Sequence, residues 1–80
     1  MRHYSVDFGF TDEGMEVALI ARGKPDDDFS IVVDIQSGRA VWLLDGEPTD
    51  ALPEWREEAE KLAVDLGAKR GITVVFVASP

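Results

Sequence analysis

The sequence predicts an α+β domain: a mostly antiparallel five-stranded sheet, in the order β-β-β-β-α-β, with one amphipathic helix packed on one face. Three observations predict it. Apolar residues occur in four short stretches before residue 45, mostly in alternation, as in strands of a half-buried sheet. They then recur at helical spacing between residues 52 and 66, and a β-branched run follows. Strands followed by a helix and one more strand are typical of this fold class.

The first two strands form the clearest predicted hairpin. In the first, small or polar residues alternate with Tyr4, Val6, Phe8 and Phe10. The segment from Thr11 to Gly14 supplies turn residues, with a glycine that tolerates positive φ. The alternation resumes in the second strand with Met15, Val17, Leu19 and Ala21. We expect these odd-numbered positions to face the core.

The third and fourth predicted strands leave one register open. The third carries Phe29, Ile31, Val33 and Ile35, and the fourth spans Ala40 to Leu44. A two-residue turn at Ser37 and Gly38 pairs Val33 with Trp42 and places the tryptophan in the core. A three-residue turn with a glycine bulge pairs Val33 with Val41 and turns Trp42 outward. An outward tryptophan would be a candidate anchor for a partner.

A helix is predicted after residue 49. Thr49 or Asp50 is suited to cap it, and Pro53 would fall in or near its first turn, where the missing N–H costs least. One apolar stripe consists of Leu52, Trp55, Ala59, Leu62, Ala63 and Leu66. The opposite side would carry Glu54, Glu57, Glu60, Lys61 and Asp65. Gly67 is the expected stop, and Ile72 to Ala78 reads as a final strand inside the sheet.

One helix covers about one sheet face, so the second face needs another cover. We expect that face to carry Ala18, Ile20 and Val32, together with either Val41 and Leu43 or Trp42 and Leu44. Self-association to a homodimer is one solution, and a partner protein is the other.

Composition restricts the classes of function. The chain has 80 residues, predicts a single domain over 1–80, and leaves no room for a deep cofactor pocket. Its net charge is -8, which opposes direct binding to nucleic acid or anionic membranes. It has no cysteine, no apolar stretch long enough to span a membrane and no signal-peptide pattern, so we expect a soluble cytoplasmic protein. A basic partner is the natural complement.

No motif indicates catalysis, a cofactor or a metal. His3, Ser5 and Asp7 point the same way along one strand, whereas a catalytic triad needs the base between nucleophile and orienting acid. Asp26, Asp27 and Asp28 lack the glycine and distal glutamate of a calcium loop, which favours a solvated loop or a partner contact. The glycines form no phosphate-binding loop. We therefore expect no enzyme activity, no cofactor and no metal.

The acidic helix is the main candidate for binding a partner. A charged outer face is ordinary for a surface helix, yet between Asp50 and Asp65 six acids stand against Arg56 and Lys61. Like charges at helical spacing cost stability, which suggests that they are used. The candidate partner-binding residues are Glu54, Glu57, Glu58, Glu60 and Asp65 of the helix, Asp26, Asp27 and Asp28 of the loop, and Trp42.

Taken as a whole, the chain resembles the small acidic anti-CRISPR proteins made by phages. The residues that carry the resemblance are the acidic rows Asp26-Asp27-Asp28 and Glu54-x-x-Glu57-Glu58-x-Glu60, on a one-helix scaffold without catalytic equipment. The resemblance implies inhibition of a CRISPR effector complex by binding its basic nucleic-acid surface, in the cytoplasm of the bacterial host.

Two other classes are open. Tyr4-x-Val6 followed by Gly14-x-x-Val17 is loosely similar to HicB-type antitoxins, which neutralise a basic RNase toxin, although Ala18-Leu19-Ile20-Ala21 stands where that family has a Pro-Asp-Leu-Pro-Gly stretch. A self-associating structural module is the third possibility.

Overall fold

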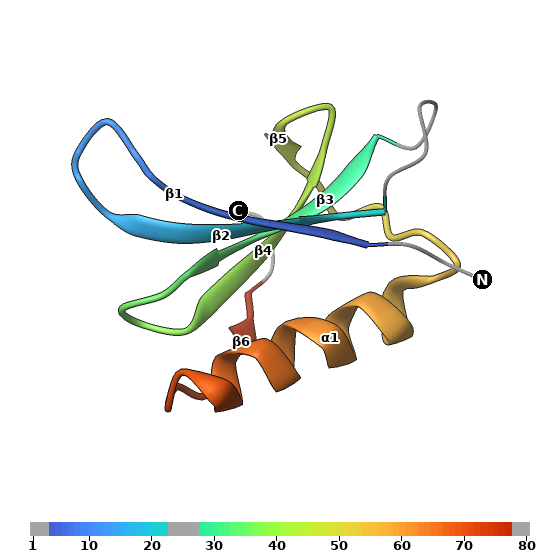
Figure 1. Ribbon diagram of the computed structural model, residues 1–80. Coiled ribbons are helices and arrows are strands. Elements are labelled where there is room, and N and C mark those ends of the chain that lie inside the picture. The colour runs from blue at the N-terminus through green and yellow to red at the C-terminus, as the bar shows by residue number, and fades with distance from the viewer. Residues whose placement is uncertain (1–3, 23–27, 78–80) are drawn as a thin grey trace.

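The computed structural model describes residues 4–22 and 28–77. An antiparallel meander contains β1 (Ser5–Phe10), β2 (Glu16–Ala21), β3 (Phe29–Asp34) and β4 (Arg39–Leu44). It is followed by the short β5 (Glu47–Pro48), the helix α1 (Arg56–Lys69) and the short β6 (Val75–Phe76). The helix lies across one face of the sheet (Figure 1). The predicted α+β fold is confirmed, with β5 as an additional strand.

The final strand lies at an edge of the sheet, so its predicted interior position is wrong. β5 pairs antiparallel with one end of β4, and β6 pairs parallel with the other end. The apolar run has another explanation. Val74 is 8% exposed and belongs to the core, and Phe76 packs against that core. Val75, which lies between them, is 55% exposed.

The core lies between α1 and one sheet face. Its buried members are Ala18, Ile20, Ile31, Val33, Ala40, Trp42, Ala59, Ala63 and Val74. The predicted phase of β2 is therefore inverted. Both alternations of that strand are apolar, so the cross-strand register decides: Ile20 lies opposite Val6, and Ala18 lies opposite Phe8, on the covered face.

The β3–β4 hairpin uses neither of the two turns considered from the sequence. Ile31 lies opposite Trp42 and Val33 opposite Ala40, which leaves residues 35–38 as the connection. The Gly38 N–H donates to the Asp34 carbonyl at 2.8 Å, and Gly38 has a φ of 81°. This register directs Trp42 into the core, where it is 5% exposed. The alternative that turns Trp42 outward is therefore wrong.

The helix begins later and ends later than predicted. It begins at Arg56 after the N-cap residue Trp55, and Leu52 is 44% exposed outside it. Pro53 disfavours a helical conformation at Leu52, the residue before it. Residues 53–56 form a turn, in which the Arg56 N–H donates to the Pro53 carbonyl at 3.1 Å. The Thr49 hydroxyl instead accepts a bond from the Ala51 N–H at 3.0 Å, in a local turn.

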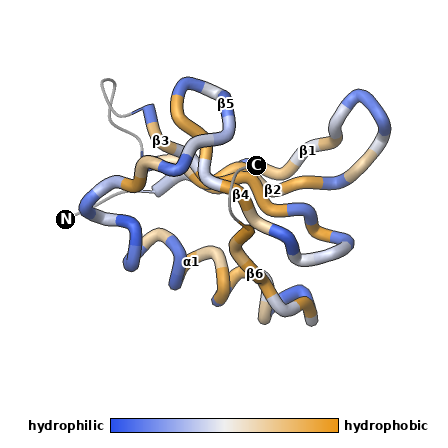
Figure 2. The backbone as a smooth tube through the Cα atoms, turned by 180° about the vertical axis from the view of Figure 1, so that it is seen from behind, coloured by the Kyte–Doolittle hydropathy of each residue, from blue (hydrophilic) through white to orange (hydrophobic). Residues whose placement is uncertain are grey.

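Small residues bring α1 close to the sheet. Ala59, Ala63 and Gly67 are its buried positions, one turn apart. Gly67 is therefore not the helix stop: it lies inside α1, where a Cβ atom would overlap the Val74 Cγ2 methyl. The chain leaves the helix at Gly71, whose φ is 76°. Figure 2 shows the hydrophobic stretches in the strands and the hydrophilic ones at the hairpin tips and the start of α1.

The centre of the outer sheet face is apolar, and no helix among the described residues covers this face. Strand alternation and register place on it Val17, Leu19, Val32, Val41 and Leu43. Leu19 is 39% exposed. The second apolar face is thus present, in the alternative that contains Val41 and Leu43, but Ala18 and Ile20 are not on it.

Candidate functional site

Exposed carboxylates lie toward one end of the molecule, where β3 begins and β4 ends, on both sides of the sheet. They come from four chain segments: the start of β3, the turn between β4 and β5, the segment before α1 and the first turn of α1. The Asp45 N–H donates to the Asp28 carbonyl at 3.1 Å, which joins the first two segments. The Trp55 ring at the helix start lies 6.4 Å from the Phe29 ring, so α1 begins beneath the same end (Figure 1). We call this surface the acidic end. Its exposed acids are Asp28, Asp45, Glu47, Asp50, Glu54, Glu57 and Glu58.

Two cations among the described residues accompany these seven acids. The Arg22 guanidinium lies over the Trp55 ring, 5.4 Å from its centroid. Arg56 Nη1 lies 3.8 Å from Glu60 Oε2, one helical turn away. Because two cations stand against seven acids, the acidic end carries a strong net negative potential. Glu57 and Glu58 also lie in the first turn of α1, where the helix dipole favours them.

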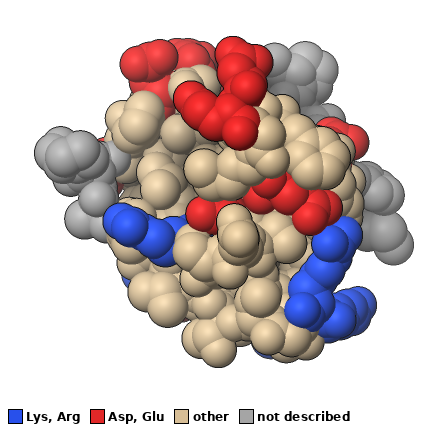
Figure 3. All heavy atoms as spheres, turned by 90° about the vertical axis from the view of Figure 1, so that its left-hand side faces the viewer, with Lys and Arg blue, Asp and Glu red and all other residues tan. Residues whose placement is uncertain are grey.

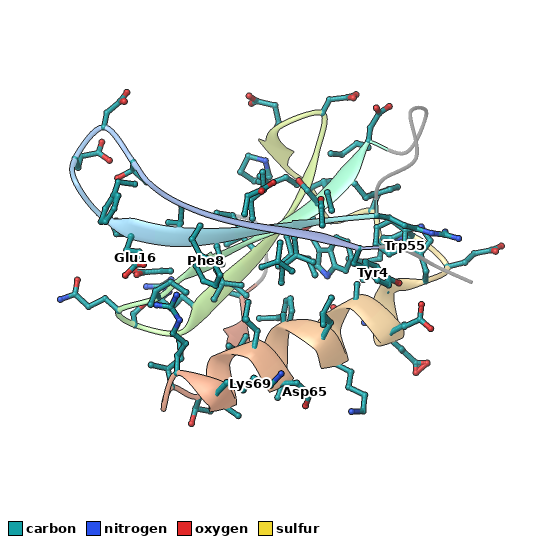
Figure 4. The ribbon with its side chains drawn as sticks, viewed as in Figure 1. Tyr4, Phe8, Glu16, Trp55, Asp65 and Lys69 are labelled. Carbon is teal, nitrogen blue, oxygen red and sulfur yellow. The ribbon has the colours of Figure 1, made fainter. Side chains whose placement is uncertain are left out.

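An aromatic cluster of Tyr4, Trp42 and Trp55 lies at the acidic end. The Trp55 ring lies 5.9 Å from Tyr4 and 5.6 Å from Trp42, between centroids. The Tyr4 hydroxyl donates to Glu58 Oε1 at 2.7 Å, so at least one of the acids is held in place. Figure 4 shows Tyr4 and Trp55 between the end of the sheet and the start of the helix.

The structure brings together some of the predicted site residues. Asp28, Glu54, Glu57 and Glu58 all belong to the acidic end. Asp26 and Asp27 lie outside the described residues. Asp65 lies farther along α1 and forms an ion pair with Lys61 at 3.0 Å (Figure 4 labels Asp65).

Glu60 and Trp42 do not belong to this surface. The predicted placement of Glu60 on the far side of the helix is wrong, because its Oε2 accepts a bond of 2.7 Å from Trp42 Nε1. Its side chain is 24% exposed. Since Trp42 itself faces the core, neither residue offers a projecting contact to a large partner.

Sequence reasoning missed three members of the acidic end: Asp45, Glu47 and Asp50. They occupy the turn around β5 and the segment before the helix, isolated from one another by apolar or turn residues. Strand pairing brings Asp45 and Glu47 toward Asp28, and Asp50 lies in the segment that leads from β5 to the helix. The Asp45-Gly46 pair, a turn signal, could have indicated exposure but not proximity.

The opposite end of the molecule has mixed charge. Figure 3 faces that end and shows acidic side chains over its upper part and across its middle, with Lys and Arg at both flanks. Arg70 Nη1 lies 3.5 Å from Glu16 Oε2, and its guanidinium stacks over the Phe8 ring at 4.3 Å. The opposite end therefore presents both signs of charge, whereas the acidic end presents seven acids with two cations.

One carboxyl group away from the acidic end has a perturbed pKa. The Ser37 hydroxyl donates to Asp34 Oδ2 at 2.9 Å, and the Gln36 N–H donates to Oδ1 at 2.9 Å. These two bonds, the hydroxyl first, lower the pKa of Asp34 because they stabilise the carboxylate. The pattern is that of a hairpin turn and serves the fold.

The described residues contain no group of three or more His, Asp or Glu side chains placed to hold a metal ion. His3 lies outside them, and α1 is too short and polar to cross a membrane.

In comparisons with known proteins, no family model, curated protein or solved structure matches the chain.

Proposed function

We propose that the protein is a non-catalytic inhibitor that binds a basic, nucleic-acid-binding surface of a partner complex and so blocks DNA binding, as the resemblance to anti-CRISPR proteins implies. One observation carries the proposal: seven exposed carboxylates from four segments lie toward the acidic end, on both sides of the sheet, against two cations. A surface of this kind complements the Lys and Arg side chains that contact phosphates.

The physical case rests on charge and on preorganisation. Clustered carboxylates steer a basic partner over long range and compete with phosphates for the same cations. The bond from the Tyr4 hydroxyl limits the conformational entropy that the Glu58 side chain loses on binding. Because the attraction is electrostatic, we expect inhibition to weaken as ionic strength rises.

The test uses charge reversals that leave internal contacts intact. Glu47→Lys, Glu54→Lys and Glu57→Lys change exposed acids of the acidic end, whereas Glu58 and Glu60 are avoided because they bond to Tyr4 and Trp42. The control combines Asp7→Lys, Asp12→Lys and Glu13→Lys, which alters net charge equally at exposed positions elsewhere.

Inhibition is measured as loss of target-DNA binding by a panel of purified CRISPR effector complexes. We expect the native chain and the control to inhibit one of them, and the acidic-end variant to be weaker by at least about tenfold, or ~1.4 kcal/mol. Equal inhibition by both variants, or none by the native chain, would contradict the proposal. Inhibition of a ribonuclease toxin instead would favour the antitoxin alternative.

The outer sheet face favours a second candidate, a self-associating module. Leu19 is 39% exposed on an apolar face without a covering helix among the described residues. Sedimentation over a wide range of concentration should then show a dimer that Leu19→Lys dissociates. A monomer at every concentration removes this candidate.

A further inference from the structure

A groove of about 280 Å³ opens beside the acidic end, between the segment before α1, the first turns of α1 and β6. Its apolar walls come from Trp42, Leu52 and Phe76, and its charged groups are Asp50, Arg56 and Glu60. Ligand pockets commonly span ~300–1,000 Å³, so this groove has room for a single side chain rather than a larger ligand.

The two carboxylates of the groove, Asp50 and Glu60, can each accept a further hydrogen bond. No described residue forms a hydrogen bond or ion pair with the Asp50 carboxylate. Trp42 and Arg56 both interact with Oε2 of Glu60, which leaves Oε1 available to a donor. Arg56 pairs only weakly with Glu60, because i,i+4 pairs at such distances contribute little and its side chain is 46% exposed. Its charge opposes a second cation, but the two carboxylates outnumber it, so the groove keeps a net negative charge.

We propose that this groove receives an arginine side chain of the partner, with its guanidinium between Asp50 and Glu60 and its stem against Leu52 and Phe76. The inference rests on the proposed function, since it names one contact of the basic surface. Arginine fits better than lysine, because its planar guanidinium forms paired bonds to carboxylates and stacks on aromatic rings. Its aliphatic stem covers apolar walls.

The first test titrates N-acetyl-arginine methylamide into the full chain and follows the Trp42 indole N–H by NMR. The control ligand is N-acetyl-citrulline methylamide, which has the same shape without the charge. We expect a shift of the Trp42 signal with the arginine probe only, saturating on the order of millimolar. Equal shifts with citrulline, or no shift with arginine, would overturn the inference.

Variants then locate the probe. We expect Asp50→Asn to weaken arginine-probe binding about tenfold, as for loss of one charged partner. Asp7→Asn, which makes the same charge change on β1, should have no effect. Glu60→Gln should also weaken binding while its amide oxygen still accepts the Trp42 bond. Undiminished binding by Asp50→Asn contradicts the assignment.

The two proposals fail separately. If the acidic-end reversals abolish inhibition but the arginine probe does not bind, the function stands and the groove is not an arginine site. If the probe binds and Asp50→Asn weakens it, yet the reversals leave inhibition intact, the groove stands and the proposed use of the acidic end is wrong.

Discussion

The Trp42 indole N–H donates a hydrogen bond of 2.7 Å to the Glu60 carboxylate, from the centre of β4 to the second turn of α1. A buried indole needs an acceptor, and the apolar core offers none. Glu60 therefore fixes the rotation of the helix against the sheet. Glu60, which the sequence alone does not distinguish from the other acids of the helix, therefore has a structural role.

Replacing Glu60 should test this role. Glu60→Leu leaves the buried indole N–H without a partner and should lower the free energy of unfolding by ~1–3 kcal/mol. Glu60→Gln keeps an acceptor oxygen and should cost less. Urea unfolding followed by tryptophan fluorescence measures both, and a Leu variant as stable as the Gln variant would show that the bond contributes nothing.

Gly38 and Gly46 form a matched pair, because both have a φ of 81°. Alanine in this left-handed region costs ~1–2 kcal/mol at either position. At Gly38 a Cβ atom would also overlap the Thr73 carbonyl oxygen, whereas at Gly46 it would meet open space. We expect Gly38→Ala to destabilise by ~1–3 kcal/mol more than Gly46→Ala in denaturant unfolding. Similar losses would contradict the close approach of residue 73.

The stacking of Arg70 on Phe8 should be measurable as a coupling energy. The guanidinium carbon lies 4.3 Å from the ring centroid and connects the residue after α1 to the sheet edge. A double-mutant cycle with Phe8→Leu and Arg70→Met, which keeps most of the apolar stem, should give ~0.5–1 kcal/mol. Additive single effects would mean that the two side chains do not interact in solution.

The Asp34 turn should give a pH dependence of known sign. Since the folded chain lowers the pKa of this carboxyl group, its stabilising effect is present above the ordinary pKa and is lost as pH falls through the folded value. Ser37→Ala removes the hydroxyl donor and should raise the pKa of Asp34 in a carbon-detected NMR titration. Gln36→Ala keeps its backbone donor and should leave that pKa unchanged. An equal response of both variants would refute the assignment.

Local patterns predicted the elements well and their faces less well. The alternation in β1 and the helical spacing of Ala59 and Ala63 were sufficient, because one phase of each segment is clearly polar. β2 is apolar in both phases, so its orientation depends on which residues of β1 and β3 lie opposite. The turn at residues 35–38 similarly needed the Asp34 bonds before the direction of Trp42 was fixed.

By itself, the sequence determined the α+β class, the excess of acid and the existence of one helix, because these follow from composition and from short-range periodicity. Only the tertiary structure decided which acids lie toward the same end of the molecule. Asp28, Asp45 and Glu57 are far apart in the chain, and strand pairing brings their segments to one end. Glu60 does not belong to that set, because the buried indole of Trp42 needs it as a hydrogen-bond acceptor. This constraint arises only when β4 and α1 pack against each other.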